Sequence, residues 1–305
     1  MIEQSAAISA TAQEVQMTTA TTLVLGGTGK TGRRVVERLS ARGLPVRVGS
    51  RAGTPPFDWT MPDTWPAAVQ GVEAVYVSYF PDFIAPGAFE AIRDFTALAV
   101  SSGVSRLVLL SGRGAPEAER CEELVRQSGA ASTIVRSSWF SQNFSESFLL
   151  EPILGGEVAL PVGDVGEPFV DADDIADVAV AALTEDGHAG QIYEVTGPRL
   201  WTFAGAVAEI ARATGREIRY VQVPIEAYVA ALEEAQLPSE IVTIIKTLFT
   251  EELDGRNENM TDGITRALGR PPRDFADYVR HTAAKGVWNV GAAAAQGAVA
   301  AVGAS

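Results

Sequence analysis

A glycine-rich stretch near the start of the chain constrains the fold more than any other feature. An apolar run ends there in closely spaced glycines, and a helical pattern follows at once. Gly27, Gly29 and Gly32 have the spacing G-x-G-x-x-G, and Gly26 begins the variant G-x-x-G-x-x-G. Glycines at these places permit a tight turn from strand to helix and let backbone N–H groups approach a pyrophosphate. The stretch predicts a dinucleotide-binding loop, and a glycine-rich turn without a ligand is the alternative.

Apolar runs and helical patterns alternate through the first half of the chain. Strands are expected at 22–25, 45–51, 56–59, 72–79, 107–111 and 133–136, and helices after the glycine loop, at 88–102 and at 118–128. Such alternation with continuous apolar strands predicts a parallel sheet covered by helices on both faces. The expected fold class is therefore α/β, a Rossmann-type doubly wound parallel sheet with a smaller, mostly helical substrate lobe.

The second half of the chain is less regular. Helices are expected at 171–183 and 203–214, strands at 191–196 and 217–223, and helical patterns dominate from 225 to 288. We divide the chain into an NAD(P)-binding Rossmann domain at 21–155 and a substrate-binding lobe at 156–290, of which 168–197 returns to the sheet. Residues 1–20 are interpreted as a flexible N-terminal extension, and residues 291–305 as an Ala/Gly-rich tail.

Composition excludes several classes of protein. The net charge is −14 and no block is rich in Lys or Arg, which argues against nucleic-acid binding. No run is long and apolar enough to span a bilayer. Cys121 is the single cysteine, and His188 and His281 lie far apart, so neither a disulfide nor a metal site is expected. We expect a cytoplasmic protein with a small-molecule substrate, and a homodimer is left open.

Cofactor choice depends on the end of the second expected strand. The NAD fingerprint places an acid there to hold the ribose hydroxyls, whereas this chain has Ser50 and Arg51. An arginine suits the 2′-phosphate, so NADP(H) is preferred over NAD(H). Lys30 and Arg33 support this, because cations in a first helical turn are unfavourable unless an anion is near; solvated surface residues are the alternative. Asp58 could accept from the adenine amino group or cap a turn.

The reactive end of the cofactor is expected beside the loops 78–81 and 111–114. No tyrosine has a lysine four residues later, so the Tyr-x-x-x-Lys proton donor of short-chain dehydrogenases is absent. The lysines of the chain are Lys30, Lys246 and Lys285. The candidate catalytic residues are Ser111 and Tyr79. The alternatives are that Ser111 only hydrogen-bonds the backbone at the strand end and that Tyr79 only packs in the core.

The remaining candidates come from these loops. Predicted cofactor-binding residues are Gly26, Gly27, Thr28, Gly29, Lys30, Thr31, Gly32, Arg33, Ser50, Arg51, Asp58, Ser78, Tyr79, Phe80, Ser111 and Gly112. Predicted substrate-binding residues are Phe80, Arg113, Trp139, Phe140 and Asn143. Two functions remain open. One is hydride transfer to an acceptor that is already electrophilic, such as an iminium ion or a quinone. The other is a dinucleotide sensor that binds a protein partner.

Several segments resemble the NmrA-like atypical short-chain dehydrogenases. They are GGTGKTG at 26–32, TIVRSSWFSQNF at 133–144, FVDADDIADVA at 169–179 and YEVTGP at 193–198. A narrower likeness, in LGGTGKT at 25–31, FDW at 57–59, TW at 64–65 and VRHTAAKGVW at 279–288, is to ergot-alkaloid reductases of the festuclavine synthase and agroclavine dehydrogenase type. The resemblance implies an NADPH-dependent imine or quinone reductase, or a non-catalytic sensor. Some branches place a catalytic lysine near the segment 117–123, where this chain has none.

Overall fold

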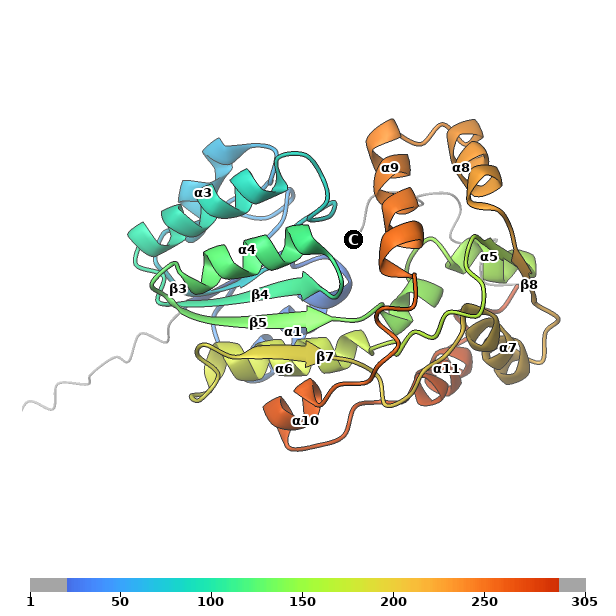
Figure 1. Ribbon diagram of the computed structural model, residues 1–305. Coiled ribbons are helices and arrows are strands. Elements are labelled where there is room, and N and C mark those ends of the chain that lie inside the picture. Colours follow the sequence, from blue (N-terminus) through green and yellow to red (C-terminus); the bar gives the residue numbers. More distant parts are fainter. Residues whose placement is uncertain (1–20, 291–305) are drawn as a thin grey trace, which may run out of the picture.

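The centre of the molecule is one parallel sheet. The computed structural model describes residues 21–290, so the predictions for residues 1–20 and 291–305 lie outside the described residues. The 6-stranded sheet has the order β2-β1-β3-β4-β5-β7 (Figure 1). Its strands are β1 (Thr21–Leu25), β2 (Val46–Gly49), β3 (Val72–Val77), β4 (Arg106–Gly112), β5 (Ala131–Ser137) and β7 (Ile192–Val195). The predicted α/β doubly wound fold is confirmed.

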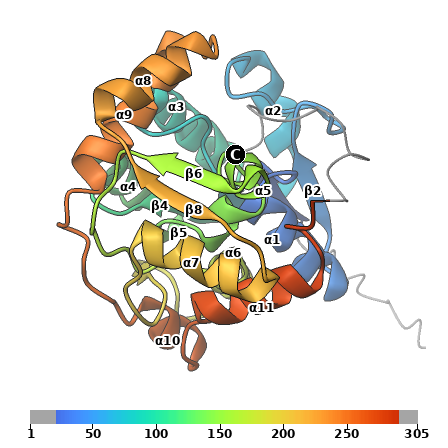
Figure 2. The same ribbon diagram turned by 90° about the vertical axis from the view of Figure 1, so that its right-hand side faces the viewer.

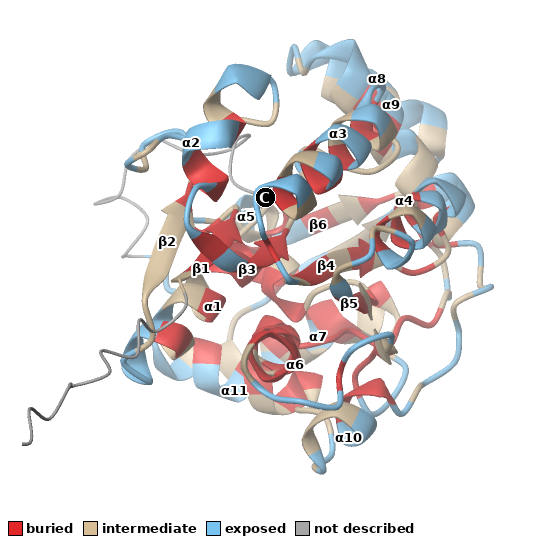
Figure 3. Ribbon diagram, turned by 90° about the vertical axis from the view of Figure 1, so that its left-hand side faces the viewer, coloured by how far each residue is buried: buried red, intermediate tan, exposed pale blue. Residues whose placement is uncertain are grey.

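Helices cover both faces of this sheet because side chains alternate along buried strands. Leu23 and Leu25 of β1 pack in one core, and Val24 packs in the core on the opposite face. The first core lies under α3 (Ala88–Ser101) and α4 (Pro116–Arg126), and the second under α1 (Lys30–Ala41) and α6 (Ala172–Thr184) (Figure 3). Both faces are therefore closed to water, and the carboxyl ends of the strands are left for a ligand.

The second half of the chain builds its own core. Strands β6 (Glu157–Leu160) and β8 (Arg219–Gln222) pair in parallel as a separate 2-stranded sheet (Figure 2). The fully buried Trp288, Phe144 and Phe169 fill the core of this lobe. The helices of this half are α5 (Leu150–Gly155), α7 (Phe203–Thr214), α8 (Ile225–Glu234), α9 (Ser239–Thr247), α10 (Gly263–Leu268) and α11 (Phe275–Ala284).

A wide turn continues α9. The segment Leu248–Glu252 is a π-helix, in which the N–H of Leu253 donates to the carbonyl of Leu248 at 3.3 Å. Single π turns inside helices occur frequently at functional sites. Helix α9 lies on the side of the molecule toward which β4 and β5 point (Figure 1). The π turn therefore belongs to the part of the lobe that faces the strand ends.

The strand predicted at 56–59 is wrong. This segment is a loop that leads into the short elements η1 (Pro62–Thr64) and α2 (Trp65–Val69). The ring of Phe57 lies 5.0 Å from Trp59 and 5.6 Å from Phe95, centre to centre, in an aromatic cluster that also includes Trp65. The apolar residues at 56–59 are explained by the burial of these rings and not by pairing in a β-sheet. No helix among residues 21–290 is long and apolar enough to cross a membrane.

Candidate active site

The glycine loop brings helix α1 into direct contact with the end of β1. Gly26 has φ +62, in the left-handed region that favours glycine. A Cβ atom on Gly32 would lie 2.1 Å from the carbonyl oxygen of Gly26, and one on Gly27 would lie 2.9 Å from that of Val24. A side chain at either position would force the loop and the helix apart. The tight turn from strand to helix that was expected of the glycines is therefore present, and the approach of the loop to a pyrophosphate stays a prediction.

The N-terminus of α1 is open to an anion. Gly29 is the N-cap residue, no side chain caps the helix, and its first turn contains no acid. By contrast, Asp171 caps α6 and Thr202 caps α7. Within residues 21–290 the first N–H groups of α1 therefore lack a side-chain acceptor, and the helix dipole favours negative charge there. These features fit the pyrophosphate of a dinucleotide.

The end of β2 presents an unpaired cation. Arg51 is exposed, and among residues 21–290 it has neither a hydrogen-bond nor a salt-bridge partner. The carboxylate of Asp58 accepts from the backbone N–H of Thr60 at 2.9 Å and from its hydroxyl at 2.8 Å. Asp58 thus caps a turn, which is the second of the two roles expected for it. No acidic residue stands next to Arg51 in the sequence. The carbonyl oxygen of Ser50 accepts a hydrogen bond from the backbone N–H of Phe57 at 2.9 Å.

Lys30 and Arg33 point away from β2. Nζ of Lys30 donates to Oδ1 of Asn143 at 3.2 Å, and Arg33 pairs with Glu146 at 2.7 Å. Burial lowers the pKa of Lys30 to about 8, against the raising effect of Glu146. The anion that two cations in a first helical turn require is therefore supplied by Glu146, in the segment after β5. Their presence does not by itself indicate a 2′-phosphate, because this anion belongs to the protein, and their contact with the cofactor stays a prediction.

Ser111 and Arg113 make contacts within the protein. The hydroxyl of Ser111 donates to Glu122 at 2.7 Å, and its side chain is buried. The guanidinium of Arg113 donates to Glu194 at 2.7 Å, to the carbonyl of Asn257 at 3.2 Å and to the side chain of Asn259 at 3.0 Å. Arg113 therefore links the sheet to the segment before α10. These bonds leave the catalytic role of Ser111 and the substrate role of Arg113 without support from the geometry, and both stay predictions.

The other predicted residues surround the strand ends. A Cβ atom on Gly26 would lie 3.5 Å from the hydroxyl of Ser78, so the end of β3 meets the glycine loop. Tyr79 packs on Trp59 at 5.0 Å between ring centres, and burial raises its pKa. Phe80 is 40% exposed. A Cβ atom on Gly112 would meet no atom within 4 Å, so there is open space beside the end of β4.

Two of the predicted substrate residues pack mainly within the protein. Trp139 lies 5.6 Å from both Phe203 and Phe249, centre to centre. Phe140 forms an isolated bridge with Val170 and packs against the core under α1 and α6. Asn143 is half-buried, and its side-chain oxygen accepts from Lys30, which leaves its amide N–H groups for a ligand. The structure thus separates the predicted residues that pack within the protein from those that remain available to a ligand.

Two carboxylates near the strand ends were missed. Glu167 precedes α6 and is only 2% exposed, and Glu252 ends the π turn. Burial raises the pKa of Glu167 to about 7 and that of Glu252 to about 8. An acid between Gly166 and Pro168 in an otherwise apolar segment was the one available signal for Glu167. Glu252 lies in an ordinary helical pattern, so the sequence contains no signal for it.

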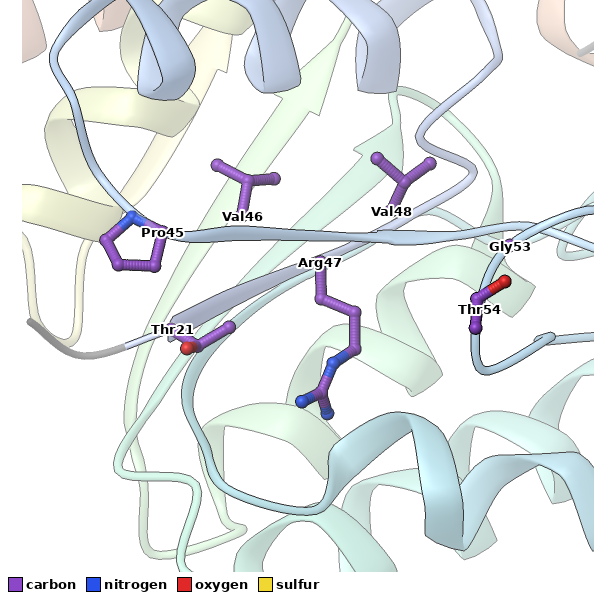
Figure 4. A pocket seen from close by; sticks show the side chains of 7 residues that line it. All are labelled: Thr21, Pro45, Val46, Arg47, Val48, Gly53 and Thr54. Carbon is purple, nitrogen blue, oxygen red and sulfur yellow. The ribbon is translucent and has the colours of Figure 1, made fainter.

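A groove of about 480 Å³ lies elsewhere, along the edge strand β2 (Figure 4). Thr21, Val46, Arg47, Val48 and Thr54 are among its lining residues. The guanidinium of Arg47 donates to the carbonyls of Ala68 and Gln70, each at 2.7 Å. The cation of this groove is thus already bound, and the groove does not include the glycine loop or the strand ends.

The fold and the loop together define a protein that binds a nicotinamide dinucleotide. Residues 26–186 match the family described as NAD(P)H-binding, and the chain belongs to this family. Its motifs resemble those of NmrA-like atypical short-chain dehydrogenases, and the structure of Nmra in complex with NAD has a similar fold, with a TM-score of 0.66 at 18% identity, covering 89% of this chain and 98% of that one.

Relatives and a solved structure agree with this assignment. The chain is 32% identical to an NAD(P)H azoreductase of Xenophilus azovorans, over 87% of this chain and 99% of the relative. It is 29% identical to agroclavine dehydrogenase of Claviceps fusiformis, over 88% of this chain and 98% of the relative. The structure of Citrobacter sp. triphenylmethane reductase complexed with NADP(H) has the same fold, with a TM-score of 0.69 at 17% identity, covering 86% of this chain and 99% of that one.

Proposed function

We propose that this protein is an NADPH-dependent reductase that passes hydride to an imine or quinone-type small molecule. The observation that carries the proposal is the uncapped N-terminus of α1 above the glycine loop, where a pyrophosphate fits. Relatives named as an azoreductase and an agroclavine dehydrogenase support the reductase class. The absence of a Tyr-x-x-x-Lys pair supports an acceptor that is easier to reduce than a simple ketone.

The preference for NADP(H) rests on Arg51. Its guanidinium is exposed at the end of β2 without a partner among residues 21–290, and no acid stands beside it. The 2′-phosphate of NADP(H) is a partner of the right charge. Lys30 and Arg33 are directed toward Asn143 and Glu146. The proposed preference for NADP(H) over NAD(H) therefore depends on Arg51 alone.

The residues of this chain mainly bind and orient. The N–H groups of the first turn of α1 would hold the pyrophosphate, and Lys30 would add positive charge near it. Asn143 would keep Lys30 in place, and Ser78 would line the loop from β3. NADPH, when bound, supplies the hydride. Positioning and electrostatics then contribute most of the rate.

The direct test is NADPH oxidation, followed by its ultraviolet absorbance, with 3,4-dihydroisoquinoline as a cyclic imine and menadione as a quinone. We expect turnover that depends on the protein with at least one acceptor. Tight binding of NADP(H) without reduction of either acceptor would contradict the enzyme and favour the dinucleotide sensor.

The cofactor assignment has its own test. Arg51→Ala removes a charge-assisted contact of about 1.5–3 kcal/mol, so we expect NADPH to bind at least about tenfold more weakly while NADH is nearly unaffected. Arg93→Ala is the matched control, because Arg93 is an exposed arginine on α3. Equal losses for NADPH and NADH in the Arg51 variant would contradict a 2′-phosphate contact.

A further inference from the structure

A neutral imine or quinone needs a proton as well as a hydride. The usual tyrosine and lysine pair is absent, and Ser111 is bound to Glu122. Another group at the strand ends must therefore hold a proton near neutral pH if such an acceptor is reduced efficiently. Glu167 is the candidate, because its carboxylate lies against the backbone just beyond the end of β5.

Glu167 is held by an isolated β-bridge, and one of its carboxylate oxygens is unpaired within the described part of the chain. Its backbone pairs with Trp201 through hydrogen bonds of 2.8 and 3.0 Å. Its Oε1 accepts from the backbone N–H of Trp139, just beyond the end of β5, at 3.1 Å. Oε2 has no hydrogen-bond or salt-bridge partner within the described part of the chain, although the residue is only 2% exposed. A buried carboxyl with one oxygen held and one unpaired is arranged to bind a ligand atom.

Burial, rather than the neighbouring charges, favours the protonated form of Glu167. Arg113 faces it from the loop after β4, but the guanidinium donates to Glu194, Asn257 and Asn259. Glu252 faces it from the π turn and itself has no side-chain partner among residues 21–290. The charges of Asp82 and Glu117 oppose ionisation of Glu252, and Arg256, which favours it, is bound to Asp254. The charge of Glu167 also opposes ionisation of the half-buried Glu252, so the two carboxyls do not both ionise easily near pH 7.

We propose that Glu167 is the proton donor of this reductase, and that its acceptors are neutral compounds that take up a proton together with the hydride. This inference rests on the proposed function. In the step, hydride reduces the acceptor carbon and the cofactor is oxidised. The electron pair of the C=N bond moves to nitrogen, which takes the proton as the O–H bond of Glu167 breaks. The resulting carboxylate regains its proton from water.

The test compares two acceptors that differ by one methyl group. 3,4-Dihydroisoquinoline above its own pKa requires a proton, whereas the N-methyl-3,4-dihydroisoquinolinium ion requires only hydride. In Glu167→Gln we expect kcat for the neutral imine to fall about 100-fold at pH 8, and kcat for the N-methyl cation to change less than about threefold. Glutamine can still accept from Trp139, so NADPH binding and circular dichroism should be retained.

Matched measurements keep the proposal falsifiable without relying on one variant. In the unaltered protein, kcat for the neutral imine should fall as pH rises through about 7 to 8, and kcat for the cation should not. Glu167→Gln should abolish this fall, whereas Glu251→Gln, at an exposed residue of the π turn, should leave it unchanged.

The outcomes separate the two proposals. Equal losses for both acceptors, no loss for either, or reduction of the cation alone by the unaltered protein would overturn the role of Glu167 and leave the reductase standing. Failure to oxidise NADPH with either acceptor or with menadione would overturn the proposed function itself.

Discussion

Two groups of buried or half-buried acids in this protein have opposite electrostatic surroundings. Along α1 and α6, the carboxylates of Asp173, Asp174 and Asp177 each face an arginine. Arg38 pairs with Asp173 at 2.6 Å and with Asp177 at 2.5 Å, and Arg270 pairs with the fully buried Asp174 at 2.7 Å. At the strand ends, Glu167 and Glu252 have no cation that pairs with them among residues 21–290.

The difference appears in their pKa values. Burial alone would raise the pKa of Asp177, but hydrogen bonds from Arg38 and Arg273 hold it below its usual value. Burial without such partners raises the pKa of Glu167 and Glu252. An unpaired buried acid costs folding stability, so its presence at a strand end is better explained by chemistry than by architecture. The paired acids instead join the two helices and the segment before α11.

The largest expected effect is on the paired group. Asp174→Asn removes a carboxylate that accepts from the backbone N–H of Arg273 at 2.7 Å and pairs with Arg270 at 2.7 Å. We expect the free energy of unfolding, measured by urea denaturation, to fall by about 3 kcal/mol. Asp262→Asn is the control, since Asp262 is 3.9 Å from Arg266 and its side chain is 76% exposed. A loss below about 1 kcal/mol at Asp174 would show that the network is not structural.

An effect of opposite sign is expected at Glu167. Its folded-state pKa of about 7 lies above the usual 4.5, so its protonated form stabilises the fold at low pH, and this contribution is lost as pH rises through about 7. Glu167→Gln cannot ionise. The free energy of unfolding of this variant, relative to that of the unaltered protein, should therefore rise by about 2 kcal/mol between pH 5 and pH 9. If the stability curves of the two proteins stay parallel in this range, the folded-state pKa of Glu167 is not raised.

The smallest effect is expected at the exposed edge of the paired group. Arg33 and Glu146 are 2.7 Å apart, with side chains 39% and 23% exposed. Arg33→Ala should lower the free energy of unfolding by about 0.5 kcal/mol and leave the affinity for NADPH nearly unchanged. Titration of the variant with NADPH measures this. A tenfold loss of affinity would assign Arg33 to the cofactor rather than to Glu146.

The fold was largely predictable because its signals are local. The glycine loop and the alternation of apolar runs with helical patterns occur within short segments, and each predicts its own element. The strand expected at 56–59 failed because Phe57 and Trp59 are apolar for the sake of ring packing with Phe95, a contact that a short pattern does not contain.

The chemistry of the site was less predictable because its decisive contacts are distant in sequence. That two cations in the first turn of α1 needed an anion was evident, but Glu146 is more than a hundred residues away. The pKa values of Glu167 and Glu252 are raised mainly by burial, which no spacing in the sequence records.

The π turn at Leu248–Glu252 also sets the helical phase of the residues at its C-terminal end. A π turn contains one residue more than an α-helical turn, and each residue of a helix rotates the side chain by about 100°. Deleting one residue from this segment would replace the bond from Leu253 to Leu248 with an α-helical one. The carboxylate of Glu252 would then leave its present direction. The length of this segment, as well as the identity of its last residue, therefore determines which side chain the lobe presents to the strand ends.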